Sequence, residues 1–369
     1  MASIREMNAM PELSLIGKQS CSTLKNIFIC RAGLTYPNQL TFILNQKPYI
    51  MNKIKRPLLY LLSLALIIIA LCGIFIAATW APDKPVAELQ AQWAPAPSVF
   101  VDVKGLAVHL RDEGVRDDPV PILLIHGTSS SLHTWEGWIS ALKGQRRVIS
   151  MDLPGFGLTG PNLQSDYSNP TYTQFILDLM DSLKVQRFVL AGNSLGGEIA
   201  WQVAVAAPQR VNKLILVDAA GYLFIPNSIP LGFRLARIPQ LAWLTENILP
   251  RSLMESSVKN VYGDPAKVTP ALLERYTAMT LRTGNRHALG LRMQHLNAGA
   301  YAEKIKTITT PTLILWGAKD QLIPATYAHQ FKQDIPGSKL VIFDQLGHVP
   351  HEEDAAATVA VVKNFLHGD

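Results

Sequence analysis

The sequence predicts an α/β fold in which helices cover both faces of a mostly parallel sheet. Short apolar runs typical of buried strands recur over residues 121–344, and segments of helical length separate most of them. Continuous apolar strands that alternate with helices indicate a parallel sheet buried on both sides. Two other features complete the prediction: an uncharged apolar run precedes this region, and one interval between strands is much longer than a crossover helix needs.

Eight strands are expected, and the first two should form an antiparallel hairpin. Residues 99–103 and 106–114 alternate in polarity and are joined by Lys104-Gly105, which is typical of a hairpin. The other runs should form the parallel part of the sheet: 121–127, 147–153, 187–192, 213–219, 312–317 and 339–344. Functional residues are expected beyond the carboxyl ends of these strands, where open α/β sheets bind their ligands.

The long interval, residues 222–305, is expected to be a helical cap inserted between two strands. It contains two runs of helical pattern, "RLARIPQLAWLTENIL" and "PALLERYTAMTLRT". The core of the fold would then consist of residues 99–221 and 306–369. Leu, Ile, Trp, Phe and Met are frequent in the cap, a composition that suits either an apolar substrate or ordinary packing on the core.

An uncharged run from Leu58 to Thr79 predicts a transmembrane helix. A helix of this length spans ~33 Å, which is enough to cross a hydrocarbon core of ~30 Å. The basic cluster at 53–56 precedes the run, so the positive-inside rule places its N-terminal side in the cytoplasm. We therefore expect a single-pass protein of the cytoplasmic membrane, anchored over residues 51–80, with its body on the extracytoplasmic side. A cleaved signal peptide is the alternative, although its apolar region is normally shorter.

The segments on either side of the anchor carry less information. Residues 1–50 show no periodicity and no motif, whereas Met51 and the basic cluster after it are typical of a natural N-terminus. We therefore leave residues 1–50 unassigned and expect translation to start at Met51, so that the start site assigned at Met1 lies too far upstream. Residues 81–98 are rich in Ala and Pro, which predicts a semi-rigid spacer between membrane and body.

The charge of the chain is unevenly distributed. The formal net charge is +6, from 34 basic and 28 acidic residues, but eight of the basic and two of the acidic residues lie in 1–80. Subtracting them leaves 26 of each sign in the body, so the basic balance does not indicate nucleic-acid binding. Cys21, Cys30 and Cys72 all precede the body, which therefore has neither a disulfide framework nor a thiolate metal site.

Ser194 is the first candidate for a catalytic residue. It lies in "FVLAGNSLGGEIAW", between a strand-like and a helix-like run, with Gly192 two positions before it and Gly196 two after it. Side chains at the flanking positions would crowd a sharp strand-to-helix turn, and glycine has none. The pattern is that of the G-x-S-x-G nucleophile elbow, although five residues match by chance too often to decide alone.

Other polar residues also follow strands, and together with Ser194 they form a pattern that resembles that of a known family. Asp320 follows one strand and His348 another, so the chain order is Ser, Asp, His. With these motifs the sequence resembles the α/β-hydrolase fold family, in its branch of cap-bearing serine hydrolases. The matching segments occur in the family's order within residues 99–369: "LLIHGTSSSLHTW", "DLPGFGLT", "GNSLGG", "LILVDAAG", "LILWGAKDQLIP" and "LGHVPHEE".

The resemblance implies a role for each of five residues. Ser194 would be the nucleophile, His348 the base and Asp320 the acid that orients the histidine. The backbone N–H groups of Thr128 and Leu195 would form the oxyanion hole. Such chemistry requires no metal and no cofactor, and the sequence contains no G-x-G-x-x-G and no P-loop.

Two of these roles have a competing candidate. His351 lies three residues after His348 and could be the base, although the "GH" turn favours His348. Asp218 also ends a strand and could supply the carboxylate, as it does in some relatives. Three further polar residues are expected to be structural: Asp152 in a turn, His126 in the loop that leads to the oxyanion hole, and Glu198 as a satisfied polar group.

The prediction is a membrane-anchored serine hydrolase that cleaves a carboxylic ester of an apolar small molecule through an acyl-enzyme. The serine at the elbow argues against haloalkane dehalogenases and epoxide hydrolases of this fold, which need aspartate there. Carbon–carbon bond hydrolysis and cofactor-free perhydrolysis are the alternatives within the fold. A catalytically silent, membrane-tethered binding module is the alternative from another class, but such modules tend to lose triad members.

Overall fold

The computed structural model describes residues 38–368. The burial of side chains is described from Lys55 onward. The chain divides into two compact units, Met1–Ala70 and Leu71–Asp369. In the first unit the described residues belong to helix α1 (Asn38–Thr79), whose last turns lie in the second unit. Of the extension 1–50, which the sequence leaves unassigned, residues 1–37 lie outside the described residues.

The C-terminal part of α1 has the properties of a membrane span. Residues Lys55–Thr79 have a mean hydropathy of 2.9, and none of this segment is buried within the described chain. Large apolar side chains such as Leu59 and Ile69 are therefore exposed. By length and composition, the helix can cross a membrane.

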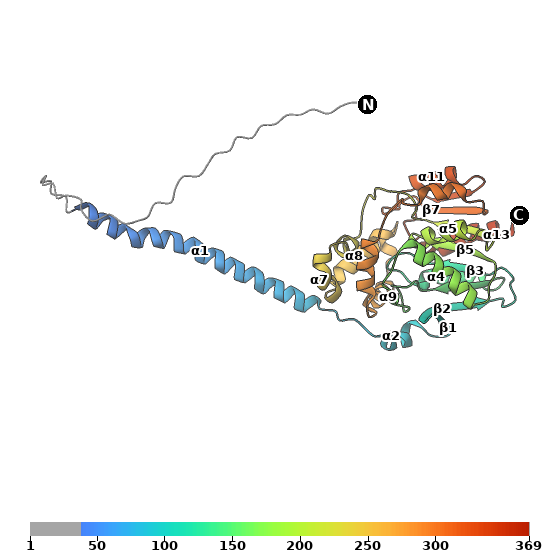
Figure 1. Ribbon diagram of the computed structural model, residues 1–369, viewed down its shortest axis with the longest axis horizontal. Helices are drawn as coiled ribbons and strands as arrows, with labels where there is room; N and C mark the ends of the chain where they lie inside the picture. The colour runs from blue at the N-terminus through green and yellow to red at the C-terminus, as the bar shows by residue number, and fades with distance from the viewer. Residues whose placement is uncertain (1–37, 369) are drawn as a thin grey trace, which may run out of the picture. The chain divides into compact units, whose positions relative to one another are not determined.

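A sheet of eight strands forms the centre of the second unit, and each predicted run contains one strand (Figure 1). The strands are β1 (Ser98–Val103), β2 (Leu106–Gly114), β3 (Ile122–Ile125), β4 (Arg147–Met151), β5 (Phe188–Asn193), β6 (Val211–Val217), β7 (Thr312–Gly317) and β8 (Lys339–Phe343). Their order is β1-β2-β4-β3-β5-β6-β7-β8. β2 pairs antiparallel with β1 and β4, and the other pairs are parallel. The chain leaves β3 for β4 on one side and returns to β5 on the other, which makes the carboxyl end of β3 a topological switch point.

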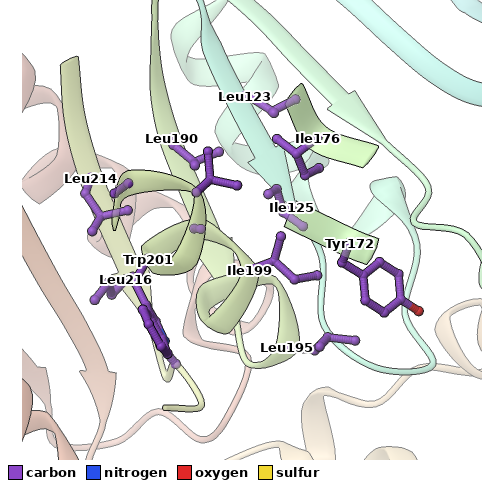
Figure 2. Close-up of a cluster of buried hydrophobic side chains, with 14 of the residues drawn as sticks. Leu123, Ile125, Tyr172, Ile176, Leu190, Leu195, Ile199, Trp201, Leu214 and Leu216 are labelled. Carbon is purple, nitrogen blue, oxygen red and sulfur yellow. The ribbon is translucent and has the colours of Figure 1, made fainter. Parts of the chain in front are cut away.

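Helices cover both faces of the sheet because successive strand residues point to opposite sides. Leu123 and Ile125 of β3 pack with α4 (Asn169–Ser182) and α5 (Leu195–Ala206), as Figure 2 shows. Ile122 and Leu124 pack on the other face, against α3 (Glu136–Leu142) and α13 (Ala355–His367). Helix α11 (Thr326–Asp334) contributes Phe331 to the first of these two clusters. Burial of strand residues on both faces is expected for a parallel sheet.

The interval between β6 and β7 folds into helices beside the sheet (Figure 1). We call this region the cap. Its α-helices are α6 (Leu231–Ala236), α7 (Ala242–Asn247), α8 (Arg251–Val261), α9 (Pro270–Leu281) and α10 (Asn285–Gln294). Val258 of α8 and Leu273 of α9 pack with Val349, which follows the last strand. The apolar composition noted in the sequence therefore partly serves to attach the cap to the core. This arrangement confirms the predicted fold class.

The Ala- and Pro-rich segment after α1 differs from the predicted spacer because it is bound to the cap. Helix α2 (Val86–Trp93) buries Leu89 against Met279 of α9. The residues before α2, Thr79–Lys84, form hydrogen bonds with two cap loops, and we call them the strap. Ala81 N donates to Asn247 O at 2.9 Å, and Lys84 N donates to Leu281 O at 2.7 Å. Composition alone could not predict these contacts, because their partners lie far along the chain.

Candidate active site

Ser194 lies at a sharp turn between β5 and α5. Its backbone has φ 55° and ψ −116°, a conformation that L-residues rarely adopt. The two flanking glycines are required by close approach. A Cβ at Gly192 would lie 2.1 Å from Gly196 O, and one at Gly196 would lie 2.3 Å from Ile125 O of β3. The turn therefore holds the serine clear of both elements, as the G-x-S-x-G pattern predicts.

His348 and Asp320 are joined by a short hydrogen bond. Asp320 follows β7 and His348 follows β8, and the distance from His348 Nδ1 to Asp320 Oδ2 is 2.6 Å. The other carboxylate oxygen, Oδ1, accepts from the backbone N–H groups of Leu322 at 2.7 Å and Ile323 at 3.0 Å. Both side chains are buried. The carboxylate is therefore held in one orientation and fixes that of the imidazole.

Ser194 and His348 line one chamber of about 660 Å³, which we call the Ser194 chamber. Asn193 connects the two: its Nδ2 donates to His348 O at 2.9 Å and to Val217 O at 3.1 Å. Within residues 38–368 the Ser194 hydroxyl makes no hydrogen bond with a protein group, so it remains open to the chamber. Catalytic hydrogen bonds are often formed only once substrate is bound.

Thr128 and Leu195 line the same chamber. Leu195 is the first residue of α5, where backbone N–H groups have no partner within the helix and the helix dipole favours negative charge. Thr128 follows β3 in a loop that His126 shapes. The imidazole Nδ1 of His126 donates to Gly127 O at 2.7 Å, and its Nε2 accepts from Leu153 N at 2.9 Å. Burial lowers the pKa of His126, so the ring is neutral and keeps this tautomer.

His351 does not line the Ser194 chamber. Its Nε2 lies 2.9 Å from Thr134 Oγ1, and its ring stacks on Trp135 with centroids 4.0 Å apart. Burial, and then the neighbouring His348, hold the pKa of His351 well below its ordinary value. His351 is therefore a neutral packing residue, and the geometry favours His348 as the base.

Asp218 lies beside the pair without replacing Asp320. One carboxylate oxygen of Asp218, one of Asp320 and one ring nitrogen of His348 lie within 4.8 Å of one another. Asp218 accepts from Gly317 N at 3.0 Å, and its other oxygen meets no N–H or O–H donor among the described residues. Burial, and then the adjacent Asp320 carboxylate, raise the pKa of Asp218 well above its ordinary value. The surroundings of Asp218 thus favour its uncharged form, whereas Asp320 is the carboxyl group that is hydrogen-bonded to the histidine.

A second buried polar pair lies one helical turn from Ser194. Glu198 accepts from Asn169 Nδ2 at 2.7 Å and lies 3.5 Å from Arg292 Nη2. Burial raises the pKa of Glu198, and Arg292 opposes this rise. Glu198 and Arg292 both line the Ser194 chamber. The sequence predicts a partner for Glu198 but not which one, because Arg292 lies 94 residues away in the cap.

The comparison with known proteins agrees with this geometry. The family model described as "alpha/beta hydrolase fold" matches residues 120–355. The chain belongs to the α/β-hydrolase fold family. A 2-hydroxymuconate semialdehyde hydrolase of Pseudomonas sp. is 28% identical over 71% of this chain and 91% of its own length. The hydrolase fold and hydrolase relatives of this kind support a hydrolytic activity.

Two solved structures illustrate the range of relatives. A meta-cleavage product hydrolase from Pseudomonas fluorescens is 26% identical, covers 73% of this chain and 97% of its own, and has a TM-score of 0.62. A membrane phospholipase A, described as a bacterial virulence factor, is 24% identical, covers 83% and 97%, and has a TM-score of 0.63. The second likeness shows the shared fold.

Asp152 holds together two loops near the site. One oxygen accepts from Leu132 N at 2.7 Å, and the other lies 2.7 Å from both Leu158 N and His109 Nδ1. Burial favours the neutral acid, but the charge and the hydrogen bond of His109 outweigh it, so the pKa of Asp152 lies below its ordinary value of 3.8. The carboxylate joins the loop after β3 to the turn after β4, in agreement with the structural role predicted for it.

We expect Asp152→Ala to lower the free energy of unfolding by ~3 kcal/mol or more, because buried donors lose their acceptor. Asp152→Asn keeps the size and should cost less. Since the folded-state pKa is depressed, this contribution is complete above the ordinary pKa and is lost as the pH falls below it. Denaturant unfolding of the full chain in detergent, from pH 7 downward, measures both effects. A difference between wild type and Asp152→Asn that stays constant in acid would contradict this account.

Proposed function

We propose that the protein is a serine hydrolase that cleaves a carboxylic ester of an apolar small molecule through an acyl-enzyme. The observation that carries this proposal is the 2.6 Å hydrogen bond between His348 Nδ1 and Asp320 Oδ2, beside the open Ser194 hydroxyl. Asp320 accepts a hydrogen bond from the Nδ1–H of His348, which leaves Nε2 as the basic nitrogen. A serine hydroxyl is a weak nucleophile and needs such a base.

The proposed reaction has two steps. His348 takes the Ser194 proton as Oγ attacks the ester carbonyl, and then transfers that proton to the departing alkoxide. The N–H groups of Thr128 and Leu195 stabilise the oxyanion, and each such donor is typically worth ~10²–10³ in rate. Water, activated by the same histidine, then hydrolyses the acyl-enzyme. Asp320 keeps the imidazole in the required tautomer and stabilises its charged form.

Carbon–carbon bond hydrolysis is a second candidate function, and the similarity to a 2-hydroxymuconate semialdehyde hydrolase favours it. The same serine and histidine could serve that reaction. The purified protein should be assayed on a simple ester and on a dienoic diketo acid. Faster turnover of the diketo acid would replace ester hydrolysis as the principal activity.

We further propose that Lys55–Thr79 anchors the hydrolase in the cytoplasmic membrane with its body on the extracytoplasmic side. The helix is sufficiently long and apolar, and basic residues precede it. A charge at the centre of a bilayer costs ~3 kcal/mol on insertion scales, and the run from Leu58 to Thr79 contains none.

Ser194 should react with a fluorophosphonate probe. Ser194→Ala should abolish this labelling and lower kcat by ~10⁴ or more, as the loss of a triad nucleophile does elsewhere. Gel fluorescence and ester turnover measure the two effects. Full labelling of the Ala variant would refute the assignment, and an unreactive wild type with no turnover would favour a silent binding module.

The two carboxyl groups should respond differently to the same substitution. Asp320→Asn should lower kcat by ~10⁴, because the amide favours the wrong histidine tautomer. Asp218→Asn should cost less than ~10-fold, because the surroundings of Asp218 already favour its uncharged form, which resembles an amide in charge. Rates are compared at equal free energy of unfolding. If Asp218→Asn proved the more damaging variant, Asp218 would be the acid.

Protease treatment of intact cells tests the topology, with the outer envelope opened if there is one. The body should be accessible, and before treatment it should resist extraction by high salt. Protection of the body until the cytoplasmic membrane is lysed would reverse the orientation. A soluble mature form that begins near residue 79 would instead indicate a cleaved signal peptide.

A further inference from the structure

The cap contains a second chamber of about 600 Å³, which we call the apolar chamber. Its walls come mainly from α6, α7 and α8 and include Leu235, Leu244, Ile248, Leu253 and Met254. Hydroxyl side chains also occur in the lining, but most of the surface that the chamber exposes is apolar, so it favours an apolar ligand over a polar one. It gains free energy from a ligand in proportion to the apolar area that the ligand buries.

The apolar chamber adjoins the Ser194 chamber. Thr128, Phe233, Val261 and Tyr276 line both, so the two spaces lie side by side next to the loop that carries one proposed oxyanion donor. An acyl carbonyl held by Thr128 and Leu195 would therefore lie at the junction. The hydrocarbon chain attached to that carbonyl can extend past Phe233 into the apolar chamber.

The only charged side chain in the described lining of the apolar chamber is Arg286, and the strap neutralises it. Arg286 Nη2 lies 2.5 Å from Asp83 Oδ1 and donates to Ala81 O at 2.8 Å. The Arg286 side chain is only 5% exposed. An unpaired guanidinium there would disfavour hydrocarbon in the chamber. With Asp83 in place, the wall has no uncompensated charge.

The strap also attaches the end of α1 to the wall of the apolar chamber. Leu249 N donates to Thr79 O at 2.9 Å, and Trp80 forms a β-bridge with Ile248. Ile248 and Leu249 both line the chamber. Thr79 is the last residue of α1, whose apolar segment is the proposed membrane anchor. The chamber wall is therefore bonded to the residues at which the chain would leave the bilayer.

We propose that the apolar chamber binds the long, unbranched acyl chain of an ester lipid taken from the membrane, and that Ser194 cleaves the ester of that chain. The proposal rests on the proposed function. The acyl C–O bond breaks while a bond forms between the acyl carbon and Ser194 Oγ. The serine proton passes through His348 to the alcohol that leaves, and water then releases the fatty acid.

Gly232 of α6 provides a way to fill the chamber without straining the fold. It lines the apolar chamber, and a Cβ there would meet no heavy atom closer than Ser257 Oγ at 3.8 Å. Gly290 of α10 is a matched control: it also lies in a cap helix, its Cβ would meet only Ala236 O at 3.8 Å, and it lines neither chamber. Gly232→Phe should therefore shorten the chamber, and Gly290→Phe should not.

The first test measures kcat/KM of the full chain in detergent on 4-nitrophenyl esters from acetate to dodecanoate. Wild type should gain about fourfold per methylene until the chamber is filled. Gly232→Phe should lower the dodecanoate value by ~10-fold or more and leave the butanoate value within ~2-fold. Gly290→Phe should change neither value. Dividing the kcat/KM of each variant by that of wild type at the same chain length cancels the effect of ester partition into micelles.

Equal losses on butanoate and dodecanoate in Gly232→Phe, or no loss on either, would overturn the acyl-chain assignment. If butanoate turnover in either case still depends on Ser194, the proposed function stands and only the chamber assignment fails. Loss of the proposed function would instead appear as no Ser194-dependent turnover of any ester.

The second test addresses the source of the chain. The full-length protein is reconstituted in vesicles of a long-chain phosphatidylcholine, and fatty acid release is measured by mass spectrometry. Wild type should release fatty acid, and Gly232→Phe should slow that release by ~10-fold or more. Turnover of soluble dodecanoate without release from vesicles would overturn the membrane as the source.

Discussion

The close approach of α5 to strands β3 and β5 is the constraint on which the candidate site depends. A Cβ at Gly196 would lie 2.3 Å from Ile125 O and 2.6 Å from His126 O, so only glycine allows the helix to start where it does. This contact places the first N–H of α5 beside the loop after β3. Ser194, Leu195 and Thr128 therefore line the same chamber.

Three buried carboxyl groups that follow strands of the sheet differ in the number of hydrogen-bond donors around them. Asp152 has three donors within 2.7 Å, which keep it charged despite burial. Asp320 accepts from two backbone N–H groups and contacts His348. Asp218 accepts from a single N–H and lies next to Asp320, and burial and that carboxylate raise its pKa. The number of donors, rather than position at a strand end, distinguishes Asp320, the proposed orienting acid, from its neighbour Asp218.

The sequence predicts well what depends on local patterns. Alternating runs predict the first two strands, apolar runs predict the other six, and glycine spacing predicts the turn at Ser194. Pattern alone leaves Asp218 and Asp320 as competing candidates, because both follow strands; their surroundings distinguish them. The strap and the apolar chamber are not predictable in this way. Asp83 and Arg286 are 203 residues apart, and nothing local in either segment indicates the other.

The strap changes the interpretation of the segment after α1. Its Ala and Pro content predicts a spacer, yet its backbone groups pair with cap loops and its carboxylate neutralises a buried cation. Because Ile248 and Leu249, which contact the strap, also line the apolar chamber, the segment that would tether the protein to a membrane is bonded to one wall of the chamber. Anchoring and substrate selection would then depend on the same contacts.

The central claim is that Ser194 carries the acyl group between the two half-reactions. The most direct measurement is rapid acid quench of the full chain during ester turnover, followed by peptide mapping by mass spectrometry. We expect an adduct with the mass of the acyl group on the peptide that contains Ser194, and on that serine alone. An adduct on another residue, or product formation with no acylated peptide at any time, would contradict the account.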